Sequence, residues 1–208
     1  MQISYFGLSS FKFGSKNYTS IIDPFDKSSG LTPPRGNADL VMLSEKNNPL
    51  YSYTQSISGN PFVIDGPGEY DVREHAITGI PIKQDGRIIT VYLIEIEGVK
   101  ILDLSHIKKL ELKQDELEDL GEADILILPV GNNAVMDFET AVKAANLLEP
   151  KIIIPSHYKT EGLKTPADNL EKFLKEIGGK HENLDKLNIK KKDIADEAVK
   201  VAVLEPLR

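Results

Sequence analysis

The chain contains no cysteine, and it has only four histidines among its 208 residues. The absence of cysteine excludes disulfide bonds, thiol catalysis and sulfur-ligated metal sites. Any metal centre that uses imidazole ligands must therefore draw on His75, His106, His157 and His181.

Long apolar runs and an excess of basic charge are also missing. The longest apolar-rich run, residues 88–94, is far shorter than the roughly 20 residues that span a bilayer. The N-terminus lacks a basic segment followed by an apolar one, so we expect a cytoplasmic protein that does not associate with membranes. A net charge of −7 repels phosphate backbones, which predicts no binding to nucleic acid.

The composition is that of a folded globular protein. Hydrophobic residues make up 40% of the chain and charged residues 27%. No internal repeat, low-complexity segment or long linker divides the sequence. We expect one domain that spans residues 1–208.

The first half of the chain alternates short β-type runs with turn residues. Three runs at 3–6, 10–13 and 18–23 predict a β-meander. A loop at 27–37 and a short buried strand at 40–43 follow. Further strands are predicted at 62–64, 69–72, 77–82, 87–96 and 99–104.

The second half alternates strands with helices, which is typical of βαβ units. Helices are predicted at 114–120, 137–148 and 166–177, and buried strands at 124–130 and 151–155. The segment 189–204 predicts one or two more strands. The fold class is therefore α/β (α+β), with a β-rich first half.

Several short motifs occur in a fixed order over nearly the whole chain. They are YFG at 5–7, IIDP at 21–24, ADLV at 38–41, GPGEY at 66–70, ADIL at 123–126, PVG at 129–131 and IIIPSHY at 152–158. As an ordered set they resemble the metallo-β-lactamase fold, in its branch of small metal-dependent hydrolases similar to ascorbate-6-phosphate lactonases. The resemblance implies an αββα four-layer sandwich with a site along one edge of its two sheets.

The chain departs from this family at the loop that carries most of the metal ligands. The family has Thr-His-x-His-x-Asp-His there, whereas residues 44–50 read SEKNNPL. Glu45 and Asn47 fall on the first two histidine positions. Pro49 and Leu50 fall on the last two ligand positions and have no donor atom.

The later ligand positions are changed as well, with one exception. The family's His-x-Gly-Asp segment aligns with residues 103–106, so Asp103 replaces a histidine and His106 replaces the bridging carboxylate. Only His157 matches a ligand in kind. Asp23, at a strand end, would point toward the site in the family fold.

Two interpretations of these residues remain open. Glu45, Asn47, Asp103, His106 and His157 either form an altered metal or acid–base site or hydrogen-bond one another in a relic pocket. His106, His157 and Asp23 are the candidate catalytic residues. An oxygen-rich donor set of this kind suits Mg²⁺, Mn²⁺ or Ca²⁺ better than Zn²⁺.

We therefore expect a protein that has lost the zinc-hydrolase site and acts as a non-catalytic binding or scaffold protein, with no tightly bound metal. The alternative is a metal-dependent hydrolase of a phosphodiester, ester or lactone that uses a non-standard site for Mn²⁺, Mg²⁺ or Zn²⁺. A third hypothesis is an assembly protein whose loop at 44–54, with Leu50, Tyr51 and Tyr53, contacts a partner. The expected partner is a small molecule, another protein or a second copy of the chain.

Overall fold

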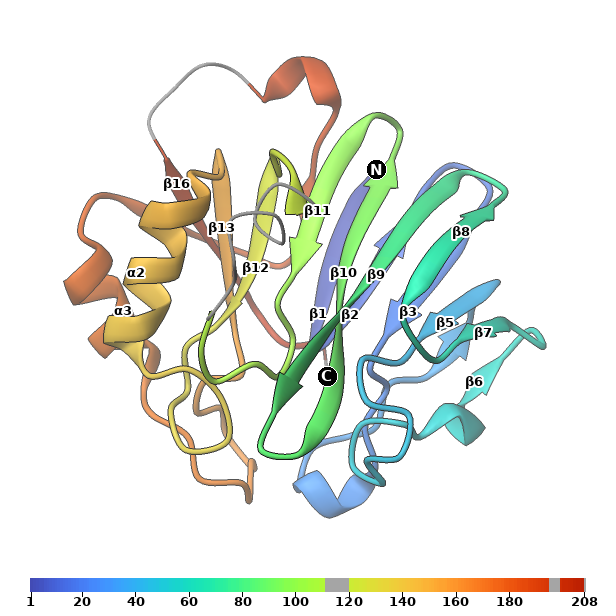
Figure 1. Ribbon diagram of the computed structural model, residues 1–208, viewed down its shortest axis with the longest axis horizontal. Coiled ribbons are helices and arrows are strands. Elements are labelled where there is room, and N and C mark those ends of the chain that lie inside the picture. Colours follow the sequence, from blue (N-terminus) through green and yellow to red (C-terminus); the bar gives the residue numbers. More distant parts are fainter. Residues whose placement is uncertain (111–119, 195–198, 208) are drawn as a thin grey trace.

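A computed structural model describes residues 1–110, 120–194 and 199–207. The predicted helix at 114–120 lies almost entirely outside these described residues. Two β-sheets dominate the structure, and they lie face to face (Figure 1). None of the helices in the described ranges is long and apolar enough to cross a membrane.

The smaller of the two sheets has six strands in the order β15-β1-β2-β3-β5-β7. Its first three strands in the sequence form the predicted antiparallel meander, and β3, β5 and β7 run parallel to one another. The strands are β1 (Gln2–Gly7), β2 (Ser10–Gly14), β3 (Thr19–Ile22), β5 (Leu40–Met42), β7 (Phe62–Ile64) and β15 (Leu187–Asn188).

The larger sheet has eight strands in the order β14-β16-β13-β12-β11-β10-β9-β8. The strands from the β14 edge to β11 are parallel to one another, and the strands β8 to β11 form antiparallel hairpins. The strands are β8 (Gly68–Val72), β9 (His75–Gln84), β10 (Arg87–Ile96), β11 (Val99–Asp103), β12 (Ile125–Pro129), β13 (Ile152–Ser156), β14 (His181–Leu184) and β16 (Lys200–Leu204). A separate pair joins β4 (Gly36–Asn37) to β6 (Ile57–Ser58).

Two α-helices pack side by side along the larger sheet, near β12 and β13 (Figure 1). Helix α2 (Phe138–Leu148) begins as predicted, because the Asp137 side chain accepts a hydrogen bond from the Thr140 amide. Helix α3 (Leu170–Ile177) begins four residues later than predicted. The Asp168 backbone explains the delay, since its amide donates to Gly131 and its carbonyl accepts from Lys159. The short 3-10 helices are η1 (Lys27–Ser29), η2 (Thr54–Ser56) and η3 (Lys191–Asp193).

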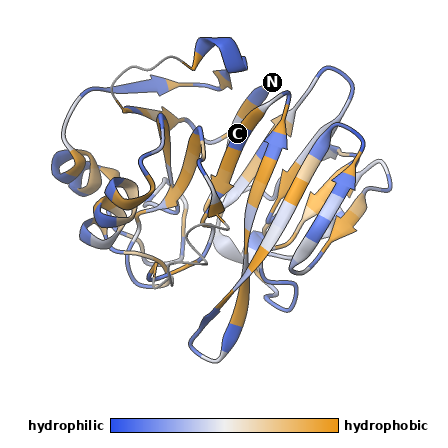
Figure 2. Cartoon of the chain, turned by 45° about the horizontal axis from the view of Figure 1, so that its top comes forward, coloured by the Kyte–Doolittle hydropathy of each residue, from blue (hydrophilic) through white to orange (hydrophobic). Residues whose placement is uncertain are grey.

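The core lies between the sheets and under the helices. Hydrophobic colour concentrates on the strands, whereas hydrophilic colour marks hairpin tips and outer helix surfaces (Figure 2). Every residue of β12 and β13 is buried, as expected for central parallel strands with covered faces. In β9 buried residues largely alternate with more exposed ones, whereas β10 contains four consecutive buried residues, 89–92.

His75 differs from the expectation of an ordinary surface histidine. It opens β9, is fully buried, and its Nε2 lies 3.1 Å from the Ser20 hydroxyl. Burial lowers the pKa of the His75 imidazole to about 4. His75 was expected at the surface because its neighbours in the sequence are polar. Strand β9, which it opens, is paired with β8 on one side and with β10 on the other, and no local pattern shows this.

Candidate functional site

The sheet topology brings several strand ends to one edge of the sandwich. β1 and β3 run in the same direction, because both are antiparallel to β2. Strands β11, β12 and β13 are parallel to one another in the second sheet. Ligand sites of α/β proteins commonly lie beyond the carboxyl ends of parallel strands.

The candidate residues follow these carboxyl ends directly. Asp23 comes after β3, Asp103 is the last residue of β11, and His157 comes after β13. His106 lies three residues beyond Asp103. All four side chains are buried, at no more than 6% exposure. They form what we call the edge cluster, defined as Asp23, Asp103, His106 and His157.

Asp23 connects the two sheets through His106. Its Oδ2 lies 3.1 Å from Nε2 of His106, while Ser44 donates its amide to Oδ1 and its hydroxyl to Oδ2. The Ser9 hydroxyl lies 3.3 Å from the same ring nitrogen. A carboxylate only accepts hydrogen bonds, so this arrangement favours the tautomer with hydrogen on Nε2. Nδ1 of His106 is then an acceptor, and it is buried without a partner among the described residues.

These residues include serine, histidine and aspartate, but they do not form a nucleophile triad. In a triad the serine and the aspartate contact opposite nitrogens of the imidazole ring. Here Ser9 and Asp23 both lie against Nε2 of His106. Ser9 is therefore not positioned as an activated nucleophile.

Asp103 holds a second polar atom without a partner. Its Oδ1 accepts from the amide and the hydroxyl of Ser105, whereas its Oδ2 is buried and unpaired among the described residues. Burial raises the pKa of the Asp103 carboxyl to about 7, and the nearby Asp23 charge raises it further. Asp103 can therefore carry or release a proton near neutral pH.

Tyr51 covers the two histidines. Its hydroxyl oxygen lies 2.8 Å from Nε2 of His157, and its ring centroid lies 4.0 Å from that of His106. Burial lowers the pKa of His157 to about 3 and raises the pKa of Tyr51 well above its usual value. A protonated phenol therefore donates to a neutral imidazole. Because Tyr51 is buried, the hypothesis that the loop at 44–54 presents it to a partner loses its main support.

Backbone strain concentrates at this edge of the sandwich. Four buried residues other than glycine have positive φ angles there: Leu8 (55°), Asp23 (46°), Ser105 (39°) and His157 (59°). Each such conformation costs about 1–3 kcal/mol and persists only where the surrounding structure enforces it. Strain of this kind clusters at functional sites.

Gly131 fixes the position of His157. It follows β12, and a Cβ atom at this residue would collide with the carbonyl oxygen of His157. The residue before it, Val130, donates its amide to Ser156. The absence of a side chain at Gly131 lets the two loops approach each other this closely.

The structure leaves two predicted site residues outside the edge cluster. Glu45 accepts hydrogen bonds from Arg87, at 3.0 Å, and from the Asn48 side chain. Asn47 is exposed. The five-residue site predicted from the sequence is therefore not assembled as a unit, because the loop turns Glu45 toward the tip of the β9–β10 hairpin.

The donor set does not fit the metal that the resemblance implies. Within residues 1–110, 120–194 and 199–207, no group of three or more His, Asp or Glu side chains is arranged to hold a metal ion. Nε2 of His106 faces Asp23 and Ser9, and Nε2 of His157 pairs with Tyr51. Both imidazoles therefore direct these nitrogens at protein atoms.

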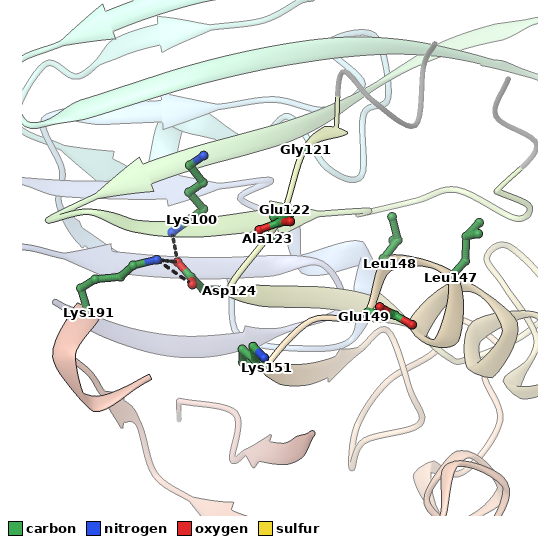
Figure 3. A pocket seen from close by; sticks show the side chains of 10 residues that line it. All are labelled: Lys100, Gly121, Glu122, Ala123, Asp124, Leu147, Leu148, Glu149, Lys151 and Lys191. Atoms are coloured by element: carbon green, nitrogen blue, oxygen red, sulfur yellow. Dashed lines mark hydrogen bonds and ion pairs between the residues drawn. The ribbon is translucent and has the colours of Figure 1, made fainter. Parts of the chain in front are cut away.

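A cavity lies at the amino ends of the parallel strands β11, β12 and β13, opposite the edge cluster (Figure 3). It has a volume of about 710 Å³, and its walls include Lys100, Asp124 and Lys191. Lys191 contacts both carboxylate oxygens of Asp124 at 2.7 Å, and the Lys100 amide donates to the same group. The Asp124 carboxylate is thus paired with Lys191, and the cavity is remote from the edge cluster.

Comparisons with known proteins place this geometry in a family. A model of the β-lactamase superfamily domain matches residues 2–157. A crystal structure from Thermotoga maritima, classed as a zinc-dependent hydrolase of the metallo-β-lactamase superfamily, superposes with a TM-score of 0.82. It is 32% identical and covers 98% of each chain. The chain belongs to the metallo-β-lactamase superfamily, and the predicted fold class is confirmed.

Sequence relatives indicate the branch. A metal-dependent hydrolase of the UPF0173 group from Natranaerobius thermophilus is 32% identical over 155 residues. The match covers 67% of this chain and 66%, slightly under two thirds, of that protein. A similarly named protein from Listeria innocua is 27% identical, with 77% of this chain and 86% of that protein covered. These names support the predicted branch of small metal-dependent hydrolases.

The expected non-catalytic binding or scaffold role is wrong by this comparison. The relatives are named metal-dependent hydrolases, and the structural neighbour is classed as a zinc-dependent one. The expectation of no bound metal is likewise unsupported. Both expectations follow from the changed loop at 44–50, whereas the charged and imidazole groups stay together in the edge cluster.

Tyr51, Ser9 and Ser44 are the site residues that sequence reasoning missed. The sequence presents Tyr51 only as an apolar residue of the loop at 44–54, although it directly follows the last changed ligand position, Leu50. Ser9 lies in the turn between β1 and β2. Its place beside the site is visible only once β1 and β3 are known to run in the same direction.

Proposed function

We propose that this chain is a hydrolase of a carboxylic ester, a lactone or a phosphodiester, with the edge cluster as its reaction site. The observation that carries the proposal is a pair of buried polar atoms without partners among the described residues, Nδ1 of His106 and Oδ2 of Asp103. Leaving such atoms unpaired costs free energy. A substrate or a water molecule that pairs with them during turnover would supply the missing hydrogen bonds.

His106 is proposed as the general base. Asp23 holds the ring with Nε2 toward its carboxylate, so that the lone pair of Nδ1 can accept a proton from a water molecule. The oxygen of that water attacks the carbonyl carbon or the phosphorus of the substrate. The imidazolium that results is stabilised by the carboxylate of Asp23.

Asp103 is proposed as the general acid. Its pKa of about 7 leaves a proton on about half of the Asp103 carboxyls at neutral pH, and that proton passes to the leaving oxygen as the ester or lactone bond breaks. His106 returns its proton to Asp103 through water in the next cycle. Because Tyr51 lies against both imidazoles, substrate reaches them only after the Tyr51 side chain moves.

The names of the relatives make a divalent cation part of the proposal, with Mn²⁺, Mg²⁺ and Zn²⁺ as the first ions to test. Such an ion supplies Lewis-acid activation of the scissile group in this class of enzyme. The mechanism above does not use this ion, because no group of three or more His, Asp or Glu side chains among the described residues is arranged to hold it. We also propose that the chain acts as one cytoplasmic domain on a small molecule.

The test is hydrolysis of p-nitrophenyl butyrate, γ-butyrolactone and bis(p-nitrophenyl) phosphate, with and without each of the three cations. Metal content of the purified protein is measured in parallel by elemental analysis. We expect hydrolysis of at least one substrate, lost in Asp103→Asn and kept in Asp71→Asn, an exposed residue of β8. Absence of hydrolysis with every substrate and cation would contradict the proposal.

A further inference from the structure

The hairpin of β9 and β10 extends past its neighbouring strands (Figure 1). Strand β8 pairs with β9 only as far as Gly79, and β11 pairs with β10 only as far as Tyr92. Among the described strands, residues 80–91 therefore pair only with one another. We call these residues the hairpin arm. Because Asp103 ends β11 and lies opposite Tyr92, the hairpin arm begins beside the edge cluster.

One side of the hairpin arm holds the segment that follows His106. The side-chain carbonyl of Gln84 accepts the amide of Lys108 at 2.8 Å, and its side-chain amide donates to the carbonyl of Lys109. A primary amide that accepts and donates at once fixes both the position and the orientation of the main chain that it binds. Asp85 adds an ion pair with Lys108, but these side chains are 56% and 39% exposed, so the pair contributes little.

The other side of the hairpin arm contacts the loop that holds Asp23. Thr90 donates its amide to the carbonyl of Ser44 at 2.8 Å, and Ser44 donates its own amide and hydroxyl to Asp23. Ser44 follows β5 of the smaller sheet, whereas His106 follows β11 of the larger one. The hairpin arm therefore contacts both segments that bring Asp23 and His106 together.

The turn that carries His106 is strained and depends on such contacts. Ser105 has a φ of 39°, and a conformation of this kind persists only where the surrounding structure enforces it. The loop before α2 supplies one contact, because Met136 donates its amide to the carbonyl of Ile107 at 3.1 Å. Gln84 supplies two more, at the next two residues of the chain. Without them the turn has fewer constraints that hold its strained conformation.

We propose that Gln84 is a positioning residue for His106. By binding the main chain of residues 108 and 109, its side chain keeps the His106 ring against Asp23, with Nδ1 in the orientation that receives a proton. The inference rests on the proposed role of His106 as the general base. A displacement of about 1 Å in a catalytic group lowers the rate by up to about 100-fold. Loss of the Gln84 contacts should therefore slow turnover without weakening substrate binding.

The positioning test follows the ring nitrogens of His106 by NMR in the intact chain with ¹⁵N-labelled histidine. In the wild type we expect one tautomer, with widely separated shifts for Nδ1 and Nε2. Gln84→Met keeps a side chain of similar length and removes both polar groups. In this variant the two shifts should approach each other, because both tautomers become populated. Exchange of the Lys108 amide with solvent should accelerate by at least about tenfold. The His106 signals are identified by their loss in His106→Gln.

Gln2→Met is the matched control. Gln2 is also partly buried, and its side chain donates to Asn188 at 2.9 Å, but it lies at the start of β1. This variant should leave the His106 ring shifts and the exchange of Lys108 as in the wild type. Gln84→Glu keeps the acceptor for Lys108 and loses the donor, so its effect should be intermediate. Wild-type ring shifts in Gln84→Met, or equal changes in Gln2→Met, would overturn the proposal.

An activity arm separates this inference from the proposed function. For p-nitrophenyl butyrate we expect kcat to fall by about 10- to 100-fold in Gln84→Met, with KM within about twofold of the wild type. Gln2→Met should keep the wild-type kcat. Wild-type kcat in Gln84→Met would overturn the positioning role and leave the hydrolase standing. No hydrolysis by the wild type would overturn the proposed function and the catalytic role of Gln84 together, even if Gln84→Met changes the ring shifts.

Discussion

The Tyr51 hydroxyl lies 2.8 Å from Nε2 of His157, where it fills the space beside an imidazole that matches a family ligand position. The same tyrosine ring packs 4.0 Å from His106. One side chain thus covers both imidazoles and pairs with one of them. Tyr51, which directly follows the changed loop at 44–50, thus connects that loop to His106 and His157.

This contact predicts the effect of Tyr51→Phe on stability. The variant keeps the ring against His106 but leaves Nε2 of His157 buried without a donor, which costs about 1–3 kcal/mol. Chemical denaturation measures the loss. The control is Tyr53→Phe, in the same loop and only partly buried, which should stay within about 0.5 kcal/mol of the wild type. Equal stability of the two variants would show that the hydrogen bond does not contribute.

Asp23→Asn separates the charge of Asp23 from its backbone conformation. Asp23 has a φ of 46°, and asparagine adopts this left-handed region readily, so the backbone should not change. The variant weakens the stabilisation of a protonated His106. Ester hydrolysis should fall by about 10²–10⁴-fold while circular dichroism stays unchanged. Full activity in this variant would remove Asp23 from the mechanism.

His75 predicts a pH dependence of stability. Its folded-state pKa is about 4, below the ordinary value of 6.5, so the unfolded chain binds the proton first as pH falls. The free energy of unfolding is therefore unaffected by this group above about pH 6.5. Between pH 6.5 and 4 it falls by up to about 3 kcal/mol, because protons bind the unfolded chain more tightly.

His75→Gln isolates this contribution, because the Gln amide can still reach Ser20 but does not titrate. Urea denaturation at pH 7.5, 5.5 and 4.5 should show the stability advantage of the wild type over this variant shrinking toward low pH. The exposed His181→Gln is the control and should track the wild type. A constant difference between wild type and His75→Gln would exclude the linkage.

Gly131→Ala should damage the site through the backbone. The new methyl group would collide with the carbonyl of His157, which a loop tied down on both sides cannot avoid cheaply. We expect a loss of more than about 3 kcal/mol in unfolding free energy. Gly66→Ala is the control, since a Cβ there meets nothing within 4 Å, and it should change stability by at most about 1 kcal/mol. Similar stabilities for both variants would contradict the close packing of these loops.

The sequence was sufficient for most of the fold because its local signals were strong. The meander of β1 to β3, strand β10 and helix α2 are predicted to within one residue at each end, and β9 extends two residues beyond its prediction at both ends. Alternating apolar residues, acid-glycine turns and the Asp137 cap explain this success. Helix α3 begins later than predicted because Asp168 bonds to two distant backbone groups, which no local pattern reveals.

The site was less predictable, because it depends on contacts between distant segments. The family alignment pointed to Asp23, Asp103, His106 and His157, and the structure gathers these four. It also placed Glu45 and Asn47 at the site by position, yet Arg87 draws Glu45 away and Asn47 faces solvent. Tyr51 takes its place beside His157 through a contact 106 residues apart in sequence.

The most direct test of the central claim is the rate of ester hydrolysis by wild type and by His106→Gln, measured with each cation at matched metal content. His106→Gln removes Nδ1 and keeps a polar group near Asp23. If His106 is the general base at the edge cluster, kcat should fall by at least about 100-fold while the melting temperature changes little. Equal rates in the two proteins, or no hydrolysis by the wild type under any condition, would contradict the account.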